Sequence, residues 1–210
     1  MKRENPHHKI HPKTILLLGV VIGLVVSLPA ILNRQQPTTP APEVVAIATL
    51  NGTPIPLDQY QLYLRENVHF FQDEMGDALW QENFAGMTAT EFIKSQTLEF
   101  FAVVVWALHH TNHPYHELTP TERTRAHQEA YTLWHQLTST EQELFSFDTL
   151  YTVRQEVILH NNIRDYLTRH YVEHQRIDVF LRMFADWRAT AELDIDTDKW
   201  GELDIQVFAR

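Results

Sequence analysis

The chain has 210 residues, of which 44% are hydrophobic and 21% are charged, a composition typical of a folded protein. Its formal net charge of −10 argues against nucleic-acid binding, because an acidic surface repels the phosphate backbone. The absence of cysteine excludes disulfide bonds, thiol catalysis, cysteine-ligated zinc and a lipid anchor on a cysteine.

The first segments of the chain predict a membrane anchor. Residues 1–13 form a basic tail, and residues 14–32 (TILLLGVVIGLVVSLPAIL) contain no charged side chain. A helix of this length spans roughly 28 Å, which is close to the thickness of the hydrocarbon core of a bilayer. Because the basic flank comes first, we expect a cytoplasmic N-terminus and an extracytoplasmic remainder. A cleaved signal peptide is the alternative, although small residues are poorly placed for cleavage after the apolar core.

An extended tether and then a folded domain are expected after the anchor. Residues 33–43 (NRQQPTTPAPE) are rich in proline, threonine and glutamine, which favours an extended linker. The extracytoplasmic domain is assigned to residues 44–210. It opens with a β-branched run at residues 44–50 (VVAIATL), which predicts a strand that ends in a turn at the following Asn-Gly pair. Apolar residues at every third or fourth position then predict a helix over residues 57–75.

Capping signals mark the next three helices. Residues 88–91 (TATE) predict the start of a second helix that reaches about residue 110. Its nine consecutive apolar residues at 100–108 are too few to span a bilayer, so we expect a buried central helix. Residues 119–122 (TPTE) predict the start of a third helix, and residues 139–142 (STEQ) that of a short fourth one.

The last part of the chain predicts two helices and two strands. Apolar stripes indicate helices over about residues 148–173 and 177–187. Residues 191–196 (AELDID) and 203–207 (LDIQV) alternate with a period of two, as half-buried strands do. A lone strand cannot satisfy its backbone groups, so we expect the early and late strands to pair. The predicted fold is mainly helical and is closed by a small sheet.

These segments resemble, in order and spacing, the N-terminal chaperone domain of SurA/PrsA-type foldases. Residues 48–55 (ATLNGTPI) and 57–64 (LDQYQLYL) are similar to the opening of that domain. Residues 94–99 (KSQTLE) are similar to the second helix of that domain, and residues 118–122 (LTPTE) are similar to the start of its third helix. Residues 191–195 (AELDI) are similar to its returning segment. The resemblance covers roughly residues 46–196, and it implies a helical lobe that binds unfolded or exported polypeptides.

The chain departs from that family in two respects. SurA/PrsA-type foldases usually carry a parvulin-type prolyl isomerase domain before the returning segment, whereas here Tyr171 leads almost directly into the last helix. The six glycines of the chain provide no isomerase signature, and the cysteine that anchors PrsA proteins to lipid is absent. We therefore expect neither isomerase activity nor a catalytic residue.

Thirteen histidines are present, and several lie close together. His109, His113 and His116 are candidate metal ligands, because His109 and His113 have a spacing that can place two imidazoles on one face of a helix. Pro114, directly after His113, is expected to end the helix there. A polar helix end without a metal is therefore the favoured interpretation, and we expect no cofactor.

Aromatic residues on the helical stripes are candidate contacts for a client polypeptide, provided that they stay exposed together. They are Phe70, Phe71, Trp106, Trp134, Phe184 and Trp187. Packing in the core is the alternative, because stripes at helical spacing usually face inward.

Three function hypotheses follow from the sequence. The first is a membrane-anchored, extracytoplasmic chaperone-like protein that binds exported or membrane polypeptides and contacts the bilayer through residues 14–32. The alternative is an accessory or structural subunit of a membrane complex, in which the same lobe docks on one partner. A degenerate prolyl isomerase is a third, less favoured hypothesis.

Overall fold

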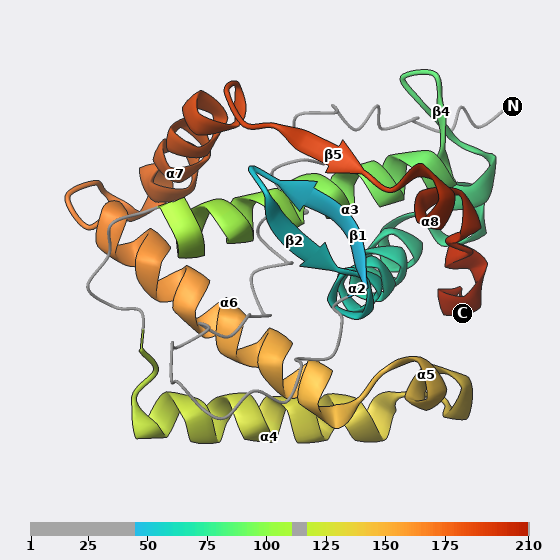
Figure 1. Ribbon diagram of the computed structural model, residues 1–210, viewed down its shortest axis with the longest axis horizontal. Coiled ribbons are helices and arrows are strands. Elements are labelled where there is room, and N and C mark those ends of the chain that lie inside the picture. Colours follow the sequence, from blue (N-terminus) through green and yellow to red (C-terminus); the bar gives the residue numbers. More distant parts are fainter. Residues whose placement is uncertain (1–44, 111–116, 210) are drawn as a thin grey trace, which may run out of the picture.

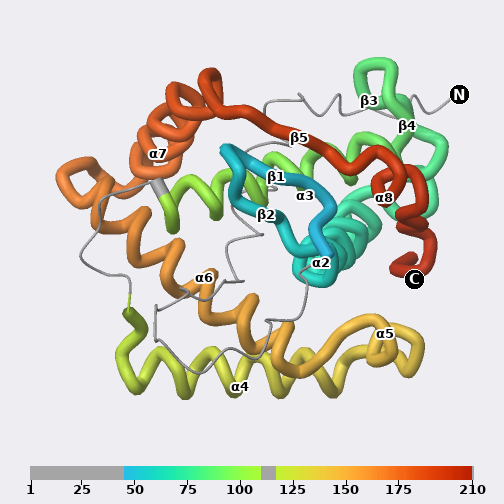
Figure 2. The backbone as a smooth tube through the Cα atoms, in the orientation of Figure 1, coloured from blue at the N-terminus to red at the C-terminus, as the bar shows by residue number. Residues whose placement is uncertain are grey.

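The structure is a computed structural model that describes residues 45–110 and 117–209 (Figures 1 and 2). The basic tail, the expected anchor at residues 14–32 and the tether lie outside the described residues. Within the described ranges, none of the helices combines the length and the apolarity needed to cross a membrane. The described part of the chain is mainly helical and contains a small antiparallel sheet.

The small sheet joins the beginning and the end of the described fold. Strand β1 (Ala46–Leu50) lies between β2 (Thr53–Pro56) and β5 (Leu193–Ile195) and runs antiparallel to both (Figure 1). Ala48 lies opposite Ile195, and Leu50 lies opposite Leu193. The predicted pairing of the early strand with the late one is therefore confirmed.

A tight turn produces the β1–β2 hairpin, whose second strand the sequence did not predict. Asn51 and Gly52 have φ angles of 48° and 76°, the positive values that a two-residue hairpin turn requires. Strand β2 contains Pro54 and Pro56, which normally disfavour a strand. They are tolerated because β2 lies at the edge of the sheet, where a missing backbone N–H breaks no ladder hydrogen bond.

The helices follow in the expected order. They are α2 (Leu57–Met75), α3 (Ala89–Val105), α4 (Pro120–Gln136), α5 (Ser139–Leu144), α6 (Phe147–Leu167), α7 (Glu173–Arg188) and α8 (Thr197–Glu202). Short elements complete the fold: the 3-10 helices η1 (Gly76–Gln81) and η3 (Ile205–Phe208), the π-helix η2 (Trp106–His110), and the hairpin of β3 (Asn83–Phe84) with β4 (Met87–Thr88).

The strand predicted at residues 203–207 is wrong. Ile205–Phe208 form the 3-10 helix η3, which has three residues per turn. Its buried side chains, Ile205 and Phe208, are accordingly three positions apart, while Val207 is 47% exposed. Asp204 caps this turn, because its carboxylate accepts a hydrogen bond from the backbone N–H of Gln206 at 2.9 Å.

Helix boundaries also differ from the prediction, and α7 begins at Glu173, four residues before its predicted start. Helix α5 is capped by Thr138 and not by Ser139, because Glu141 can complete a reciprocal capping box with Thr138. Helix α6 ends at Leu167, several residues before the predicted end near residue 173. The hydroxyl of Thr168 donates to the carbonyl of Arg164 at 2.7 Å at this helix end.

The hydrophobic core lies where the long helices meet. Helix α2 packs against α3, and α6 packs against α4, α2 and α7. Large side chains with almost no exposure come from α2, α3, α6 and α7, including Tyr60, Phe101, Leu150, Ile163 and Phe180. Burying one such side chain stabilises a fold by about 1.5–3 kcal/mol. The core therefore holds α2 and α6 in fixed positions, and α4 packs against the outside of α6.

The start of α4 supports a prediction on stability. The hydroxyl of Thr119 accepts the backbone N–H of Glu122 at 3.3 Å, and a Glu122 carboxylate oxygen accepts the backbone N–H of Thr119 at 2.8 Å. We expect Thr119→Ala to lower the free energy of unfolding by about 1 kcal/mol, measured by urea denaturation and tryptophan fluorescence. Thr124→Ala, at an exposed interior position of α4, is the control and should not destabilise the protein. Equal unfolding midpoints for the two variants would contradict the prediction.

Candidate functional site

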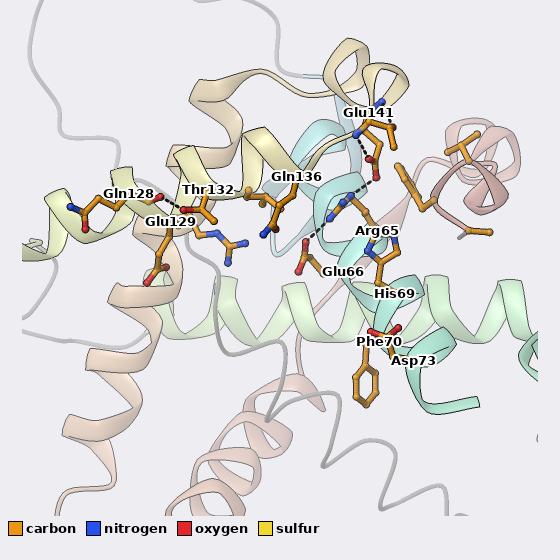
Figure 3. Close-up of a pocket in the computed structure, with 16 residues that line it drawn as sticks. Arg65, Glu66, His69, Phe70, Asp73, Gln128, Glu129, Thr132, Gln136 and Glu141 are labelled. Carbon is orange, nitrogen blue, oxygen red and sulfur yellow. Dashed lines mark hydrogen bonds and ion pairs between the residues drawn. The ribbon is translucent and has the colours of Figure 1, made fainter. Parts of the chain in front are cut away.

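A cavity of about 900 Å³ between α2 and α4 is the candidate functional site (Figure 3). Helix α5 and residues 207–209 border it, and α6 contributes Arg154. The lining from α2 is Arg65, Glu66, His69, Phe70 and Asp73; that from α4 is Gln128, Glu129, Thr132, Leu133 and Gln136; that from α5 and the residue before it is Glu141 and Thr138.

One wall of the cavity is a row of uncharged polar side chains on α4. Gln128, Thr132 and Gln136 are four residues apart, so they follow one another along the same face of α4 (Figure 3). All three are exposed, and the cavity is therefore accessible to solvent along this wall. Amide and hydroxyl groups can both donate and accept hydrogen bonds, which suits a ligand with alternating donors and acceptors.

A buried ion pair links the opposite wall to α5. The Nε atom of Arg65 donates to a carboxylate oxygen of Glu141, and its Nη1 atom donates to Glu66 at 2.9 Å (Figure 3). The side chains of Arg65 and Glu141 are only 7% and 5% exposed. Burial raises the pKa of Glu141, but hydrogen bonds from Arg65 and from the Thr138 backbone outweigh it, so this pKa lies below its ordinary value. Glu141 is therefore ionised at neutral pH.

A second buried cation, Arg154 of α6, lies at the cavity. It is 6% exposed. Burial lowers the pKa of Arg154, while the nearby carboxylates of Glu66 and Glu129 oppose this effect. A guanidinium remains charged even after a modest decrease in pKa. Charged side chains from α2, α4 and α6, namely Glu66, Glu129 and Arg154, therefore lie close together at the cavity.

Apolar side chains complete the lining. Phe70 is partly buried, Leu133 is buried and Val207 is largely exposed. Phe208 is buried and stacks on Phe145, with 6.1 Å between the ring centroids. The cavity therefore combines apolar surface with hydrogen-bonding groups, as sites for organic ligands do.

The six aromatic residues predicted as client contacts are separated in the structure. Phe71, Trp106 and Phe184 are buried, whereas Phe70, Trp134 and Trp187 are partly buried. Phe70 and Phe71 form one cluster, in which Phe71 contacts Phe92. Trp106, Phe184 and Trp187 form a second cluster together with Phe180, and Trp134 contacts Phe147. Of the six, Phe70 lines the cavity.

Two buried ionisable residues lie one turn apart on α6. Glu156 is fully buried, and neither of its carboxylate oxygens has a hydrogen-bond partner among the described residues. Burial, and then the charge of Asp58, raise the pKa of Glu156 well above its ordinary value. His160 is 1% exposed and contacts Phe180 edge-on, and burial with the nearby Arg164 lowers its pKa to about 3. His160 is therefore uncharged at neutral pH, and burial favours the uncharged form of Glu156.

The histidine candidates for a metal site remain a prediction. His109 lies in η2, while His113 and His116 lie outside the described residues. Across residues 45–110 and 117–209, no group of three or more histidines and carboxylates is arranged to hold a metal ion.

Sequence reasoning did not identify the cavity residues other than Phe70. The polar residues of α2 and α4 appear in the sequence as the solvent-facing sides of two amphipathic helices. Arg65 and Glu141 are 76 residues apart, and no local pattern connects them. The available signal for a buried charge at this site was a charged residue next to an apolar residue of the helix stripe, as Arg65 is next to Leu64.

Comparisons of the chain with protein-family models, with curated proteins and with solved structures give no match.

Proposed function

We propose that this chain is a chaperone-like protein that binds extended segments of exported polypeptides in the cavity between α2 and α4. The proposal includes an anchor at residues 14–32 and an extracytoplasmic position for the folded domain. It also includes kinship with the SurA/PrsA N-terminal lobe, without isomerase activity. The order of the helices and the sheet that joins β1 to β5 are consistent with this kinship.

The observation that carries the proposal is the mixed chemistry of the cavity walls. An extended polypeptide offers backbone N–H and C=O groups in alternation, with side chains between them. The row of Gln128, Thr132 and Gln136 can pair with such a backbone, because all three side chains are exposed. The two amides can donate or accept, and the Thr132 hydroxyl, which donates to the carbonyl of Gln128, can accept. Phe70 and Leu133 provide apolar surface for the client's side chains.

The size of the cavity also agrees with this ligand class. A volume of about 900 Å³ is at the upper end of the range typical for small-molecule sites, about 300–1,000 Å³. A space of this size has room for a short peptide segment. Because one wall is exposed, the rest of a long polypeptide can continue outside the cavity.

Filling the cavity tests the proposal. Thr132→Trp places a large ring in the space from an exposed position of α4. Thr124→Trp is a matched control, because Thr124 is also exposed on α4 and lies outside the cavity lining. The two hydroxyls even make the same bond, donating to the carbonyl four residues earlier at 3.0 Å for Thr132 and 3.1 Å for Thr124.

The measurement is suppression of client aggregation by the full-length protein, followed by light scattering with several unrelated unfolded clients. We expect suppression at near-stoichiometric ratios by the wild type and by Thr124→Trp, and a loss of about fivefold or more in Thr132→Trp. This magnitude corresponds to roughly 1 kcal/mol of lost binding free energy. Equal suppression by all three proteins would exclude the cavity as the binding site. No suppression by the wild type would exclude the chaperone-like function and favour a subunit dedicated to one partner.

A further inference from the structure

Helix α4 and the start of α6 together form a surface of aromatic side chains, which we call the aromatic flank. The ring centroids of His127 and Phe147 are 5.3 Å apart, and those of His127 and Tyr151 are 5.7 Å apart. Trp134 also contacts Phe147. The aromatic flank consists of His127, Tyr131, Trp134, His135, Phe147 and Tyr151.

The aromatic flank is separate from the cavity. His127, Tyr131 and His135 each precede by one position a residue of the polar row that lines the cavity, and one position turns an α-helix by about 100°. Tyr131 and His135 are in edge-to-face contact at 4.4 Å. Both histidines are exposed, and Tyr131 is 56% exposed. Exposed aromatic surface of this kind is typical of a contact surface.

The aromatic flank also offers hydrogen-bond donors. Within residues 45–110 and 117–209, the hydroxyls of Tyr131 and Tyr151 and the indole N–H of Trp134 make no hydrogen bond. A segment in the polyproline II conformation has no internal hydrogen bonds, so its carbonyl oxygens can accept from such donors. Proline-rich segments bind aromatic-lined surfaces in this conformation. The chemistry of the aromatic flank therefore suits a proline-rich segment.

The chain itself contains such a segment in its tether, residues 33–43. This stretch has three prolines, and residues 37–40 read PTTP. Polyproline II has three residues per turn, so Pro37 and Pro40 lie on the same side of that helix. The only charges of the tether are Arg34 and Glu43, which give a net charge of zero. The acidic domain therefore does not repel it.

The described fold begins close to the aromatic flank. The carbonyl of Val45 accepts the backbone N–H of Leu57 at 2.8 Å, so the chain enters the fold beside the start of α2 (Figure 1). The hydroxyl of Thr149 donates to the carboxylate of Asp58 at 2.7 Å. Thr149 is two residues from each of the two α6 members of the aromatic flank. At about 3.1 Å per residue, residues 37–40 can reach roughly 15–25 Å from Val45, which is enough to lie along the flank.

We propose that residues 37–40 bind the aromatic flank of the same chain in the polyproline II conformation, with Pro37 and Pro40 against its rings. Docking of this kind orients the folded domain relative to residues 14–32, whereas a free tether would let the domain rotate. The inference uses neither the cavity nor its clients, so it does not depend on the proposed function.

The mobility of a spin label on the tether tests this inference in the full-length protein in mild detergent. The chain contains no cysteine, so Thr39→Cys provides a single labelling site. Three residues per turn place position 39 on a different side of the polyproline II helix from Pro37 and Pro40, which leaves their contact intact. We expect an immobilised component to dominate the electron paramagnetic resonance spectrum.

Tyr131→Ala in the labelled protein should lower the ratio of immobilised to mobile label about fivefold or more, because it removes an aromatic contact. Tyr171→Ala is the matched control, since Tyr171 is 46% exposed and lies beyond the far end of α6, and it should change nothing. The joint replacement Pro37→Ala/Pro40→Ala should act like Tyr131→Ala. It lies outside the described domain, so its effect does not come from unfolding. Urea denaturation would verify that the tyrosine variants are folded.

Each contrary outcome has a definite meaning. A label that stays mobile in the protein with an intact flank and tether would overturn the inference. No loss in Tyr131→Ala, or an equal loss in Tyr171→Ala, would overturn the assignment to the aromatic flank. A loss of immobilisation in Thr132→Trp would place the tether in the cavity instead, and an immobilised fraction that rises with protein concentration would show binding to a second copy. Client binding is measured separately by aggregation and is unaffected by these results.

Discussion

Glu141→Ala should lower the free energy of unfolding by about 3 kcal/mol, because it leaves the guanidinium of Arg65 buried without its main partner. The substitution also removes half of the capping box of α5, in which Glu141 accepts the backbone N–H of Thr138 at 2.8 Å. Glu66 moderates the loss, since it still accepts a hydrogen bond from Arg65. Urea denaturation followed by tryptophan fluorescence would measure the effect.

A double-mutant cycle separates the ion pair from the packing of α5. Replacing both Arg65 and Glu141 with apolar residues of similar size should recover most of the stability, because no uncompensated charge remains. Glu143→Ala, at an exposed position of the same short helix, should change the unfolding free energy by less than about 0.5 kcal/mol. A loss below about 1 kcal/mol in Glu141→Ala would show that Glu66 alone compensates Arg65.

Glu156→Met should stabilise the protein by about 2 kcal/mol at pH 8, because it replaces a fully buried carboxyl without hydrogen-bond partners by an apolar side chain with a similar unbranched stem. The expected effect depends on pH. The pKa of Glu156 in the folded protein is raised above its ordinary value of 4.5, so the unfolded chain releases this proton at a lower pH than the folded protein does. The stability that Glu156 contributes is therefore complete below about pH 4.5 and is lost as the pH rises toward its folded pKa.

The measurement is the urea midpoint of the wild type and of Glu156→Met across the range from pH 4.5 to pH 9. The difference between the two should increase steadily with pH, and Glu156→Gln should show the same pH dependence as Glu156→Met. Glu143→Met serves as the control at an exposed site and should run parallel to the wild type. Parallel profiles for the wild type and Glu156→Met would show that Glu156 is not held protonated by its surroundings.

The parts of the fold that were predicted correctly depend on local chemistry or on a requirement that every strand shares. The starts of α3 and α4 follow from the capping residues Thr88 and Thr119, which act on backbone groups three positions away. The pairing of β1 with β5 follows because each strand has backbone groups that need partners. The first argument needs only neighbouring residues, and the second needs only the rule that backbone groups of a strand must be paired.

The wrong prediction at residues 203–207 has a simple origin. Apolar residues at 203, 205 and 207 match a strand, whereas the pair 205 and 208 matches a 3-10 helix. In so short a segment both patterns are present. The choice depends on the core site that Phe208 occupies beside Phe145, which only the folded structure defines.

The cavity could not be predicted, because it depends on how α2 and α4 are oriented about α6. His160 illustrates the same difficulty: in the sequence it interrupts the apolar stripe of α6, but in the structure Phe180 of α7 covers it. The aromatic candidates failed to form one surface for a related reason. Their spacing indicated that they lie on helices, but it did not indicate which helix packs against each face.

The sheet also determines when the fold can be completed during synthesis. Strand β1 can pair with β2 at once, but its other edge waits for β5, and the backbone N–H of Glu192 that bonds the side chain of Asn51 follows 141 residues later. At about 5–20 residues per second, this edge stays unpaired on the order of ten seconds while the chain is made. An open strand edge can pair with other chains, so the nascent protein can associate wrongly through β1 until β5 has emerged.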